Sequence, residues 1–285
     1  MEFRNLANLN ITDLLSVFNL SFSDYLVPFH LTLKQLTSKI NAEKVDMNLS
    51  VGAFQSDQIM GFILHAEKVE DGKRMIYNAG TGVIPEYRGQ GLVRKMYEYS
   101  IPVLRDRKAD ILTLEVIEGN EPAVRAYTNL GFKISRKLLC FKGNIEASEK
   151  YAEIQIEQMD HFNWETFKSF WDIEPSWQSS VIVLDQMRND LVILGAYKIN
   201  ELVGYAIFNP AIGKVYQVAV DKKRRRKGIG AKLFKVIGEM SEGSATVLNN
   251  VDDASESTYK FLCGLGLENW VSQFEMIYSI QSTKL

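Results

Sequence analysis

The sequence predicts an α/β protein built from two tandem copies of one domain, each a mixed, mostly antiparallel sheet flanked by helices. Strand-like stretches alternate with amphipathic stretches of helix length through both halves of the chain. A glycine loop at 88–93 recurs at 225–230, so the two loop arginines stand 137 residues apart (225 minus 88). A chain of 285 residues is long enough for two ordinary domains. We therefore expect one domain at residues 1–145 and a second at 151–285.

Strand and helix patterns follow one another in a regular order through the first half. Apolar and β-branched runs predict strands, and apolar residues spaced to share one face predict helices. The expected strands fall at residues 3–8, 49–55, 58–69, 76–84, 111–116 and 133–142. The expected helices fall at residues 10–22, 88–109 and 121–130. Asn10 or Thr12 is suited to cap the first helix, and Asn120 to cap the last.

The second half repeats this plan more compactly. Its expected strands fall at residues 151–156, 191–198, 202–208, 214–220, 245–249 and 270–279. Its expected helices fall around residues 164–171, after the second glycine loop as far as 239, and at 255–265. The small and charged residues 143–150 are typical of a linker between the two copies.

Composition excludes several classes of function. The net charge of −2 gives no basic field for nucleic acid, and no apolar run approaches the roughly 18 residues of a membrane span. The N-terminal residues have neither a signal-peptide nor a transit-peptide pattern, so we expect a soluble, cytoplasmic protein. Two cysteines without a Cys-x-x-Cys pair and three scattered histidines predict neither a disulfide framework nor a metal site.

The stretch from Thr81 to Val93 predicts a binding site for an anion. Pro85 ends the preceding strand because it has no NH to donate, and Gly89 and Gly91 let the backbone approach a ligand closely. The first NH groups of the following helix have no intrahelical partner, and the helix dipole adds to their attraction for negative charge. A phosphate or pyrophosphate is the expected ligand.

This loop belongs to a wider ordered pattern. The pattern comprises Val83, Pro85, Arg88, Gly91, an amphipathic helix, the strand at 111–116, Asn120, Ala123, Tyr127 and Gly131-Phe132. It resembles the GCN5-related N-acetyltransferase (GNAT) superfamily, whose pyrophosphate loop has the form Arg/Gln-x-x-Gly-x-Gly/Ala. Val93 departs from the small final residue, whereas the second loop fits at every defined position. The basic residues 222–227 lie between a valine-rich strand and Gly228-Ile229-Gly230. This place in the sequence favours phosphate binding over a nucleic-acid or nuclear-localisation role for them.

The resemblance implies that acetyl-CoA is the cofactor and that an acetyl group is transferred to a primary amine by direct attack in a ternary complex. In the first domain, the implied cofactor-binding residues are Thr81, Val83, Arg88, Gly89, Gln90, Gly91, Leu92, Val93 and Asn120. In the second domain, they are Arg225, Arg226, Lys227, Gly228, Ile229 and Gly230.

The resemblance also implies two catalytic positions in the first domain. Tyr127 stands where the family has the residue that donates to the departing CoA thiolate. A thiol has a pKa of about 8.5 and a tyrosine about 10, so Tyr127 is expected to act first as a hydrogen-bond donor and second as a general acid. The backbone NH that stabilises the developing oxyanion is expected within residues 81–83, and Val83 is the predicted catalytic residue of this segment.

The acceptor amine is expected beside the N-terminal helices. Tyr25 and Phe29 are candidate substrate contacts because the family builds one wall of its acceptor site there, although both aromatics are equally suited to a core. Glu115 or Glu118 could act as a base through water, since the strand at 75–83 carries no acid or histidine. Without a strong base the enzyme would favour an α-amino group, whose pKa is near 8, over a lysine near 10.4.

Several alternatives remain open from the sequence. Aligning Gly266 with Gly131 puts Leu262 at the position of Tyr127, so catalysis is expected in the N-terminal domain. One alternative places catalysis in the second domain with Tyr259 as acid, and another is a non-catalytic acyl-CoA-binding or partner-binding protein. A small amine, an antibiotic, a peptide N-terminus and a protein lysine all fit as acceptors. A homodimer is compatible with the sequence.

Overall fold

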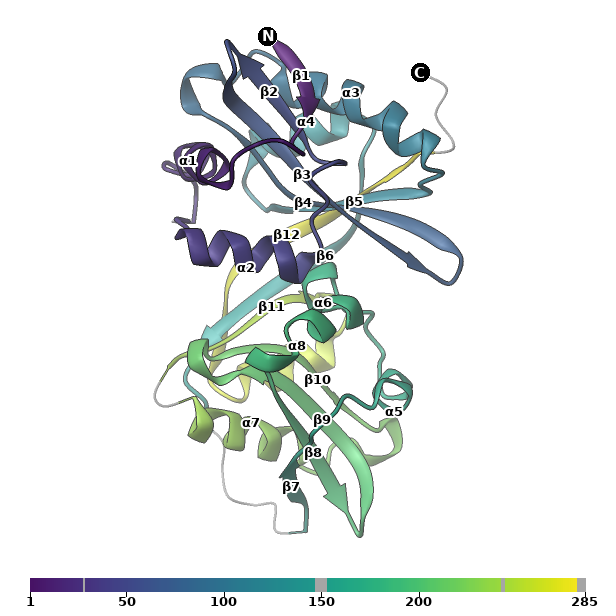
Figure 1. Cartoon of the computed structure of the whole chain (residues 1–285). Helices are drawn as coiled ribbons and strands as arrows, with labels where there is room; N and C mark the ends of the chain where they lie inside the picture. Colours follow the sequence, from purple (N-terminus) through teal and green to yellow (C-terminus); the bar gives the residue numbers. More distant parts are fainter. Residues whose placement is uncertain (28, 147–152, 242–243, 281–285) are drawn as a thin grey trace. The chain divides into compact units, whose positions relative to one another are not determined.

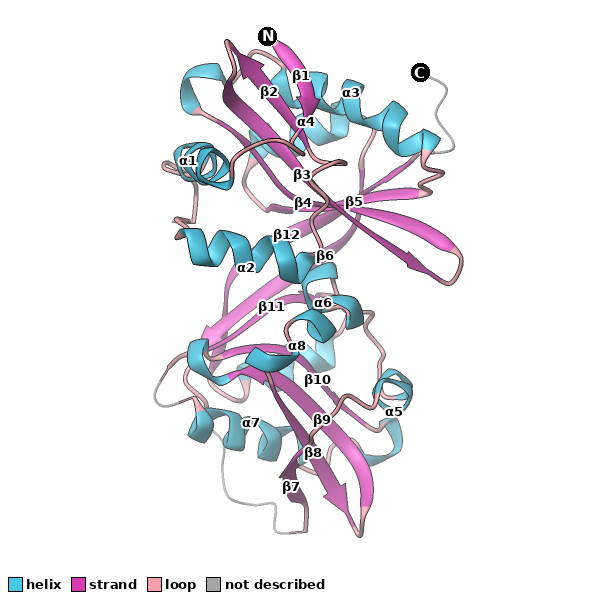
Figure 2. Ribbon diagram, viewed as in Figure 1, coloured by secondary structure: helices cyan, strands magenta, loops and turns pink. Residues whose placement is uncertain are grey.

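The computed structural model of the chain describes residues 1–27, 29–146, 153–241 and 244–280. The chain folds into two compact units, which are Met1–Ser135 together with the chain from Phe274 onward, and Arg136–Gln273 (Figure 1). Each unit combines a mixed sheet with helices, which confirms the predicted α/β fold class (Figure 2). Residues 147–152, which include much of the expected linker and the start of the expected second domain, lie outside the described residues.

The sheet of the first unit contains one parallel pair that matters for the site. Its strand order is β1 (Glu2–Asn5), β2 (Val51–Gln55), β3 (Gln58–Glu70), β4 (Lys73–Val83), β5 (Ile111–Ile117) and the end of β12 (Leu267–Ser279). Strands β1 to β4 are antiparallel, and β4 runs parallel to β5. The register of β4 with β5 extends only as far as Asn78 opposite Leu114. β4 therefore continues beyond this pairing while it remains paired with β3.

Helices cover both faces of this sheet. They are α1 (Ile11–Ser21), α2 (Leu33–Glu43), α3 (Leu92–Asp106) and α4 (Glu121–Asn129). Phe18 of α1 stacks on Phe62 of β3 with 5.4 Å between ring centroids. The next residue of β3, Ile63, packs in the core with Met96 of α3. Because neighbouring strand residues point to opposite faces, α1 and α3 lie on opposite sides of the sheet.

Two local signals explain where these helices begin. The helix expected from residue 88 starts instead at Leu92, because Gly91 has φ 71° and so stands outside the helix as its N-cap. The sequence pattern alone did not predict α2. Its start is fixed by a capping box in which Thr32 and Gln35 satisfy each other's backbone NH groups.

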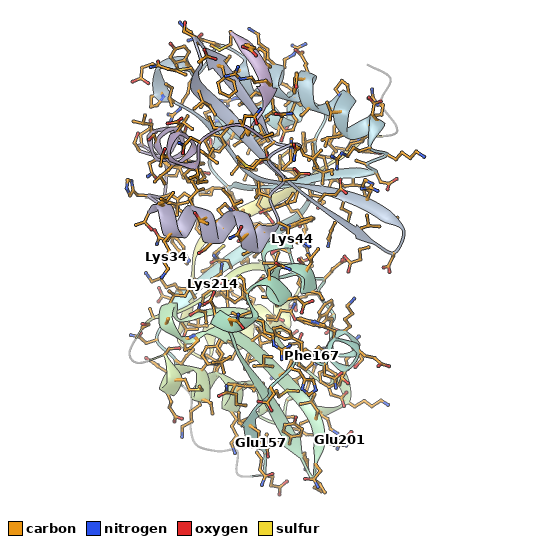
Figure 3. The ribbon with its side chains drawn as sticks, viewed as in Figure 1. Lys34, Lys44, Glu157, Phe167, Glu201 and Lys214 are labelled. Carbon is orange, nitrogen blue, oxygen red and sulfur yellow. The ribbon has the colours of Figure 1, made fainter. Side chains whose placement is uncertain are left out.

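The second unit repeats the architecture of the first. Its strand order is the start of β12, β6 (Lys133–Gly143, from Arg136 on), β11 (Thr246–Asp252), β10 (Lys214–Val220), β9 (Glu201–Asn209), β8 (Val192–Lys198) and β7 (Gln155–Gln158). Its helices are α5 (Trp164–Ser169), α6 (Val181–Gln186), α7 (Ile229–Met240) and α8 (Glu256–Cys263). Phe167 of α5 stacks on Tyr205 of β9 at 3.8 Å. Figure 3 labels Phe167 and also Glu201, which begins β9 at the hairpin with β8.

The last strand of each sequence repeat extends into the other unit: most of β6 lies in the second unit, and the end of β12 lies in the first. β6 follows α4 in the chain, but it pairs with β11, from Leu138 opposite Asp252 to Gly143 opposite Thr246. β12 follows α8, but its end lies beside β5, where Met276 and Tyr278 enter the core of the first unit. The expected boundary between residues 145 and 151 follows the sequence repeat, whereas the compact units exchange most of β6 and the end of β12.

Candidate active site

The loop between β4 and α3 is fastened by the side chain of Arg88. Its guanidinium donates to both carboxylate oxygens of Asp24 at 2.7 Å, to the Ser21 carbonyl at 3.0 Å and to the Val83 carbonyl at 3.1 Å. The hydrogen bonds from Arg88 lower the pKa of the Asp24 carboxyl. Arg88 therefore ties the end of α1 to the end of β4. Its side chain contacts protein atoms, so the loop's backbone is the part that could contact a ligand.

The backbone of this loop is open where glycine was expected to allow close approach. Gly89 and Gly91 have φ values of 72° and 71°, and no atom lies within 4 Å of where a Cβ would stand on either residue. Leu92 and Val93 begin α3, so their NH groups are among those that a helix leaves without an intrahelical partner. The Gln90 amide donates to the Glu86 carbonyl at 3.2 Å, which holds that side chain within the loop.

The same clamp recurs in the second unit. Arg225 donates to Asp172, to the Phe170 carbonyl at 2.9 Å and to the Val220 carbonyl at 3.1 Å. This hydrogen bonding lowers the pKa of Asp172. Arg226 occupies the place of Gly89 with φ 62°, and Gly228 has φ 79° at the N-cap of α7. Both glycine loops thus share one backbone shape and one arginine anchor.

The rest of the second loop is only partly exposed. Ile229 is buried, and a Cβ at Gly230 would lie 2.9 Å from the ring of Phe261. Lys227 is exposed, whereas Lys222 pairs with Asp172 at 3.4 Å. The basic run therefore contributes to holding the loop as well as to its charge.

Strand β4 is irregular beside the site, as its glycines suggested, and the irregularity falls at Ala79. The register with β3 shifts between Asn78 and Gly80, which makes Ala79 the bulged residue. The Asn78 carboxamide spans this bulge, because its Oδ1 accepts from the Gly80 NH at 2.9 Å and its Nδ2 donates to Thr81 Oγ1 at 2.7 Å. Val83 ends the strand opposite Gly61, and its carbonyl is held by the arginine clamp.

Tyr127 of α4 is buried in this region. Burial raises the pKa of its phenol to about 12, and hydrogen bonding to Thr81 and Asn78 partly opposes the rise. The ring of Tyr127 meets that of Tyr97 edge to face with centroids 6.3 Å apart. Tyr97 is also fully buried, and its hydroxyl accepts from Asn78 Nδ2 at 2.7 Å. Neither Asn78 nor Tyr97 was singled out from the sequence.

Tyr25 and Asn120 also join this group, whereas Phe29 lies further out. Burial raises the pKa of Tyr25, and hydrogen bonding with Asn120 partly opposes the rise. Asn120 also accepts from the Ala123 NH at 3.3 Å, as the expected helix cap. Phe29 is 41% exposed, and its ring packs on Phe22 and Phe18 at the α1 end of the aromatic cluster.

Glu115 lies on the other face of the sheet. Its carboxylate accepts from the Tyr77 hydroxyl at 2.5 Å. Burial raises the pKa of Glu115 to about 7, the Tyr77 hydrogen bond opposes this, and the charges of Glu275 and Glu43 add to it. Tyr77 and Asn78 are neighbours in β4 and point to opposite faces, so Glu115 and Tyr127 approach the end of the β4–β5 pairing from opposite sides.

The matching part of the second unit carries a different set of side chains. Its strand β10 bulges at Tyr216, which is 137 residues after Ala79. The next residue, Gln217, is buried where the first unit has Gly80. Its amide accepts from the Tyr205 hydroxyl at 2.7 Å and donates to the Ser179 carbonyl at 2.6 Å. A hydrogen-bonded side chain therefore stands at the position where the first unit has a glycine, Gly80.

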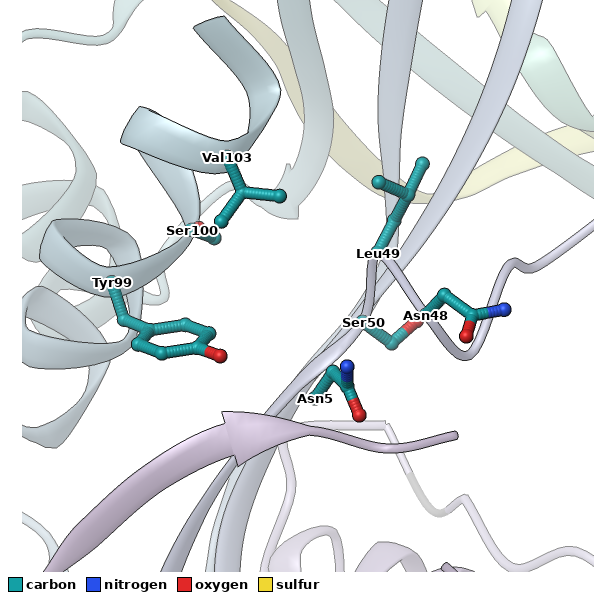
Figure 4. Close-up of a pocket in the computed structure, with 7 residues that line it drawn as sticks. All are labelled: Asn5, Asn48, Leu49, Ser50, Tyr99, Ser100 and Val103. Carbon is teal, nitrogen blue, oxygen red and sulfur yellow. The ribbon is translucent and has the colours of Figure 1, made fainter. Parts of the chain in front are cut away.

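One small cavity of about 80 Å³ in the first unit lies apart from these residues (Figure 4). Its walls come from β1, the segment before β2, and α3, and its lining is Asn5, Asn48, Leu49, Ser50, Tyr99, Ser100 and Val103. It includes none of the predicted site residues.

Within the described residues, no helix combines the length and apolar character needed to cross a membrane.

A glycine loop at a helix N-terminus, a buried tyrosine and a half-buried carboxylate lie at this end of the sheet, and such a set is suited to group transfer from a phosphate-bearing donor. Comparison with known proteins identifies the class. The model of the acetyltransferase (GNAT) family matches residues 14–132 and again residues 156–262. The chain belongs to this family and carries its domain twice, which confirms the predicted tandem member.

Solved structures and a curated relative agree with this assignment. The chain is similar to a GCN5-related N-acetyltransferase from Sphaerobacter thermophilus, with a TM-score of 0.77, 14% identity and coverage of 99% of this chain and 96% of that one. It is also similar to a tandem GNAT protein from the clavulanic acid biosynthesis pathway, with a TM-score of 0.73, 13% identity and coverage of 99% of both chains. At these identities the likeness shows the fold.

The curated relative is N-alpha-acetyltransferase 30 of Schizosaccharomyces pombe. It is 33% identical over 81 residues, which make up 28% of this chain and 54% of the relative. The match thus spans about half the length of that protein.

Proposed function

We propose that the protein is an N-acetyltransferase that moves the acetyl group of acetyl-CoA to a primary amine, with the reaction in the first unit. The observation that carries this proposal is the arrangement at the end of β4, where the clamped glycine loop, the bulge and the buried Tyr127 lie together. Residues 1–145 are the proposed catalytic repeat, and residues 151–285 are its partner repeat.

Most of the predicted cofactor-binding residues of the first unit have a proposed role. The NH groups of Gly89, Gly91, Leu92 and Val93 bind its diphosphate, and Arg88 acts by fastening the loop rather than by touching phosphate. Asn120 and Thr81 line the path toward the reacting sulfur. A backbone NH between Thr81 and Val83 donates to the carbonyl oxygen as negative charge develops there, an interaction that is typically worth a few kcal/mol.

Tyr127 is proposed to donate a hydrogen bond to the departing sulfur. Acetyl-CoA supplies an activated thioester, and transfer breaks the carbon–sulfur bond as the amine nitrogen bonds to the carbonyl carbon. With a pKa near 12, Tyr127 remains protonated at neutral pH. Full proton transfer to a thiolate of pKa about 8.5 would be uphill by about 5 kcal/mol, which favours the role of donor over that of acid.

Glu115 is proposed as the general base, oriented by the Tyr77 hydroxyl. A base of pKa about 7 accepts a proton from an α-ammonium of pKa near 8 at a cost of about 1.4 kcal/mol. From a lysine ammonium near 10.4 the cost is about 5 kcal/mol. The acceptor class that we propose is therefore an α-amine at the N-terminus of a peptide, and the name of the matched fission-yeast relative points the same way.

The second unit is proposed to bind acyl-CoA or to support the fold without transferring acetyl groups. Its arginine clamp is intact, which favours binding. Against transfer, Gln217 fills the strand face and Leu262 is buried where Tyr127 stands in the first unit. Tyr259 is 41% exposed and packs on Phe141, so it is poorly placed to act as the acid.

The test combines turnover with cofactor binding. Purified protein is supplied with acetyl-CoA and a short peptide with a free α-amine, and thiol release is followed. A peptide with a blocked N-terminus and one lysine serves as the comparison. We expect the free α-amine to react faster and Tyr127→Phe to lower turnover at least tenfold. Equal rates on both peptides would contradict the acceptor class, and unchanged turnover in Tyr127→Phe would contradict the mechanism.

Calorimetric titration with acetyl-CoA then separates the two units. Gly91→Glu and Gly228→Glu each add a carboxylate to one loop, and each serves as the control for the other. We expect turnover and one binding event to be lost in Gly91→Glu, while Gly228→Glu keeps turnover. Loss of turnover only in Gly228→Glu would move the reaction to the second unit.

A further inference from the structure

A buried polar network lies directly behind Tyr127. Asn78 donates to both Thr81 Oγ1 and Tyr97 Oη at 2.7 Å, and the Tyr97 ring meets the Tyr127 ring edge to face with centroids 6.3 Å apart. Asn78 is 5% exposed and Tyr97 is fully buried. The four side chains come from β4, α3 and α4, so the network connects three elements at one point.

Burying this many polar groups is unfavourable unless the fold or the function requires it. Each amide or hydroxyl loses its hydration, and its internal hydrogen bonds return little net stability, so apolar side chains of similar shape are often equally stable or more so. The chain contains the same domain twice, so a comparison of the two units shows whether the fold requires these polar groups.

The second unit has an apolar residue at every one of these positions. Val215, Val218 and Phe234 stand 137 residues after Asn78, Thr81 and Tyr97, in the same register as the two glycine loops and the two bulges. Leu262 replaces Tyr127. An equivalent turn begins at each of these two residues. The Leu130 NH donates to the Tyr127 carbonyl at 3.1 Å, and the Leu265 NH donates to the Leu262 carbonyl at 3.1 Å.

These replacements are buried in an ordinary core. Val215, Phe234 and Leu262 belong to the apolar cluster of the second unit, and Val218 packs against it. The domain therefore folds with apolar side chains at these four positions. The polar side chains occur in the unit that carries Tyr127. The bulge recurs without an asparagine, so Asn78 is not needed to form the bulge itself.

We propose that Asn78 and Tyr97 are positioning residues for Tyr127, which hold Thr81 and the Tyr127 hydroxyl at one place and orientation through the Asn78 carboxamide. The inference rests on the proposed function of Tyr127 as donor to the departing sulfur. Asn78 has a fixed orientation because its Oδ1 accepts from the Gly80 NH, so its Nδ2 faces Thr81 and Tyr97. Tyr97 limits the movement of the Tyr127 ring, which it meets edge to face.

The test copies the second unit into the first. Tyr97→Phe and Asn78→Val are made in the wild type and again in Tyr127→Phe, and kcat and KM are measured with acetyl-CoA and a short peptide with a free α-amine. Tyr99→Phe, on the same helix but 39% exposed, is the matched control. Thermal unfolding verifies folding, which we expect to be retained because Phe234 and Val215 occupy the equivalent positions.

We expect Tyr97→Phe and Asn78→Val each to lower kcat about tenfold with little change in KM, and Tyr99→Phe to change neither. In the Tyr127→Phe background the same substitutions should change kcat less than twofold, because the group that they position is gone. Equal losses in both backgrounds would overturn the inference alone. Unchanged turnover in Tyr127→Phe itself would overturn the proposed mechanism and the inference with it.

Discussion

Replacing Glu115 by glutamine should stabilise the protein at alkaline pH even as it removes the proposed base. The pKa of Glu115 is raised from 4.5 to about 7, chiefly by burial. At about 1.4 kcal/mol per pH unit, this shift sets an upper bound of about 3 kcal/mol on the cost of the ionised form. Glu115 is half-buried rather than sealed off, so solvent screening should leave about 1 to 2 kcal/mol.

The sign of the pH dependence follows from the direction of the shift. A carboxyl with a raised pKa in the folded state contributes stability that is present below its unfolded pKa and is lost as the pH rises toward 7. Glutamine does not titrate. The advantage of Glu115→Gln over the wild type should therefore be small at pH 4.5, grow up to about pH 7 and stay level above it.

Denaturant unfolding at pH 4.5 and pH 8.5 measures this difference directly. Glu118→Gln is the matched control, because Glu118 is exposed just beyond the end of the same strand. Turnover at pH 8.5 should fall in Glu115→Gln and remain in Glu118→Gln. A stability difference that is the same at both pH values would refute the raised pKa, and a loss of turnover in Glu118→Gln alone would transfer the role of base to that residue.

Two further predictions concern the groups that hold the site. Tyr77→Phe removes the hydrogen bond that stabilises the Glu115 carboxylate. The pH at which kcat/KM reaches half its maximum should therefore rise above its wild-type value. An unchanged pH profile would show that Tyr77 does not influence the base. Arg88→Ala releases the loop from Asp24 and Val83, so KM for acetyl-CoA should rise several-fold, whereas a rise that Lys95→Ala matches would indicate a general loss of charge.

The backbone conformation of the glycine loops could be predicted from the sequence because it is local. A glycine at a positive φ and a helix start leave a clear pattern within six residues, and its recurrence at 225–230 doubled the evidence. The role of Arg88 was harder to predict. Its partner Asp24 lies 64 residues away, and the resemblance favoured an arginine beside phosphate over an arginine that fastens the loop.

The exchange of the last strands had no signal in the sequence. β6 and β12 each follow a helix, and each has the apolar content of a strand in its own repeat. Which of two similar sheets a strand joins depends on pairing across more than a hundred residues, such as β6 with β11, and period-two patterning does not encode the partner.

The polar network behind Tyr127 had a signal that the loop comparison did not use. Extending the offset of 137 from the loops to the flanking strand and helix pairs Asn78 with Val215 and Tyr97 with Phe234. A polar residue that replaces an apolar one at a core position of a repeat is a candidate functional residue, because the other copy folds without it.

The two units together separate what the fold supplies from what side chains supply. The arginine clamp, the glycine φ values and the strand bulge recur in both, so the backbone geometry of the loop comes with the fold. The side chains proposed for the chemistry do not recur, because apolar residues stand at the matching positions of the second unit. A tyrosine in place of Leu262 would meet Val218 and Phe234 instead of hydrogen-bond donors, and Gln217 would still cover the strand. One substitution therefore cannot convert the second unit into a copy of the first.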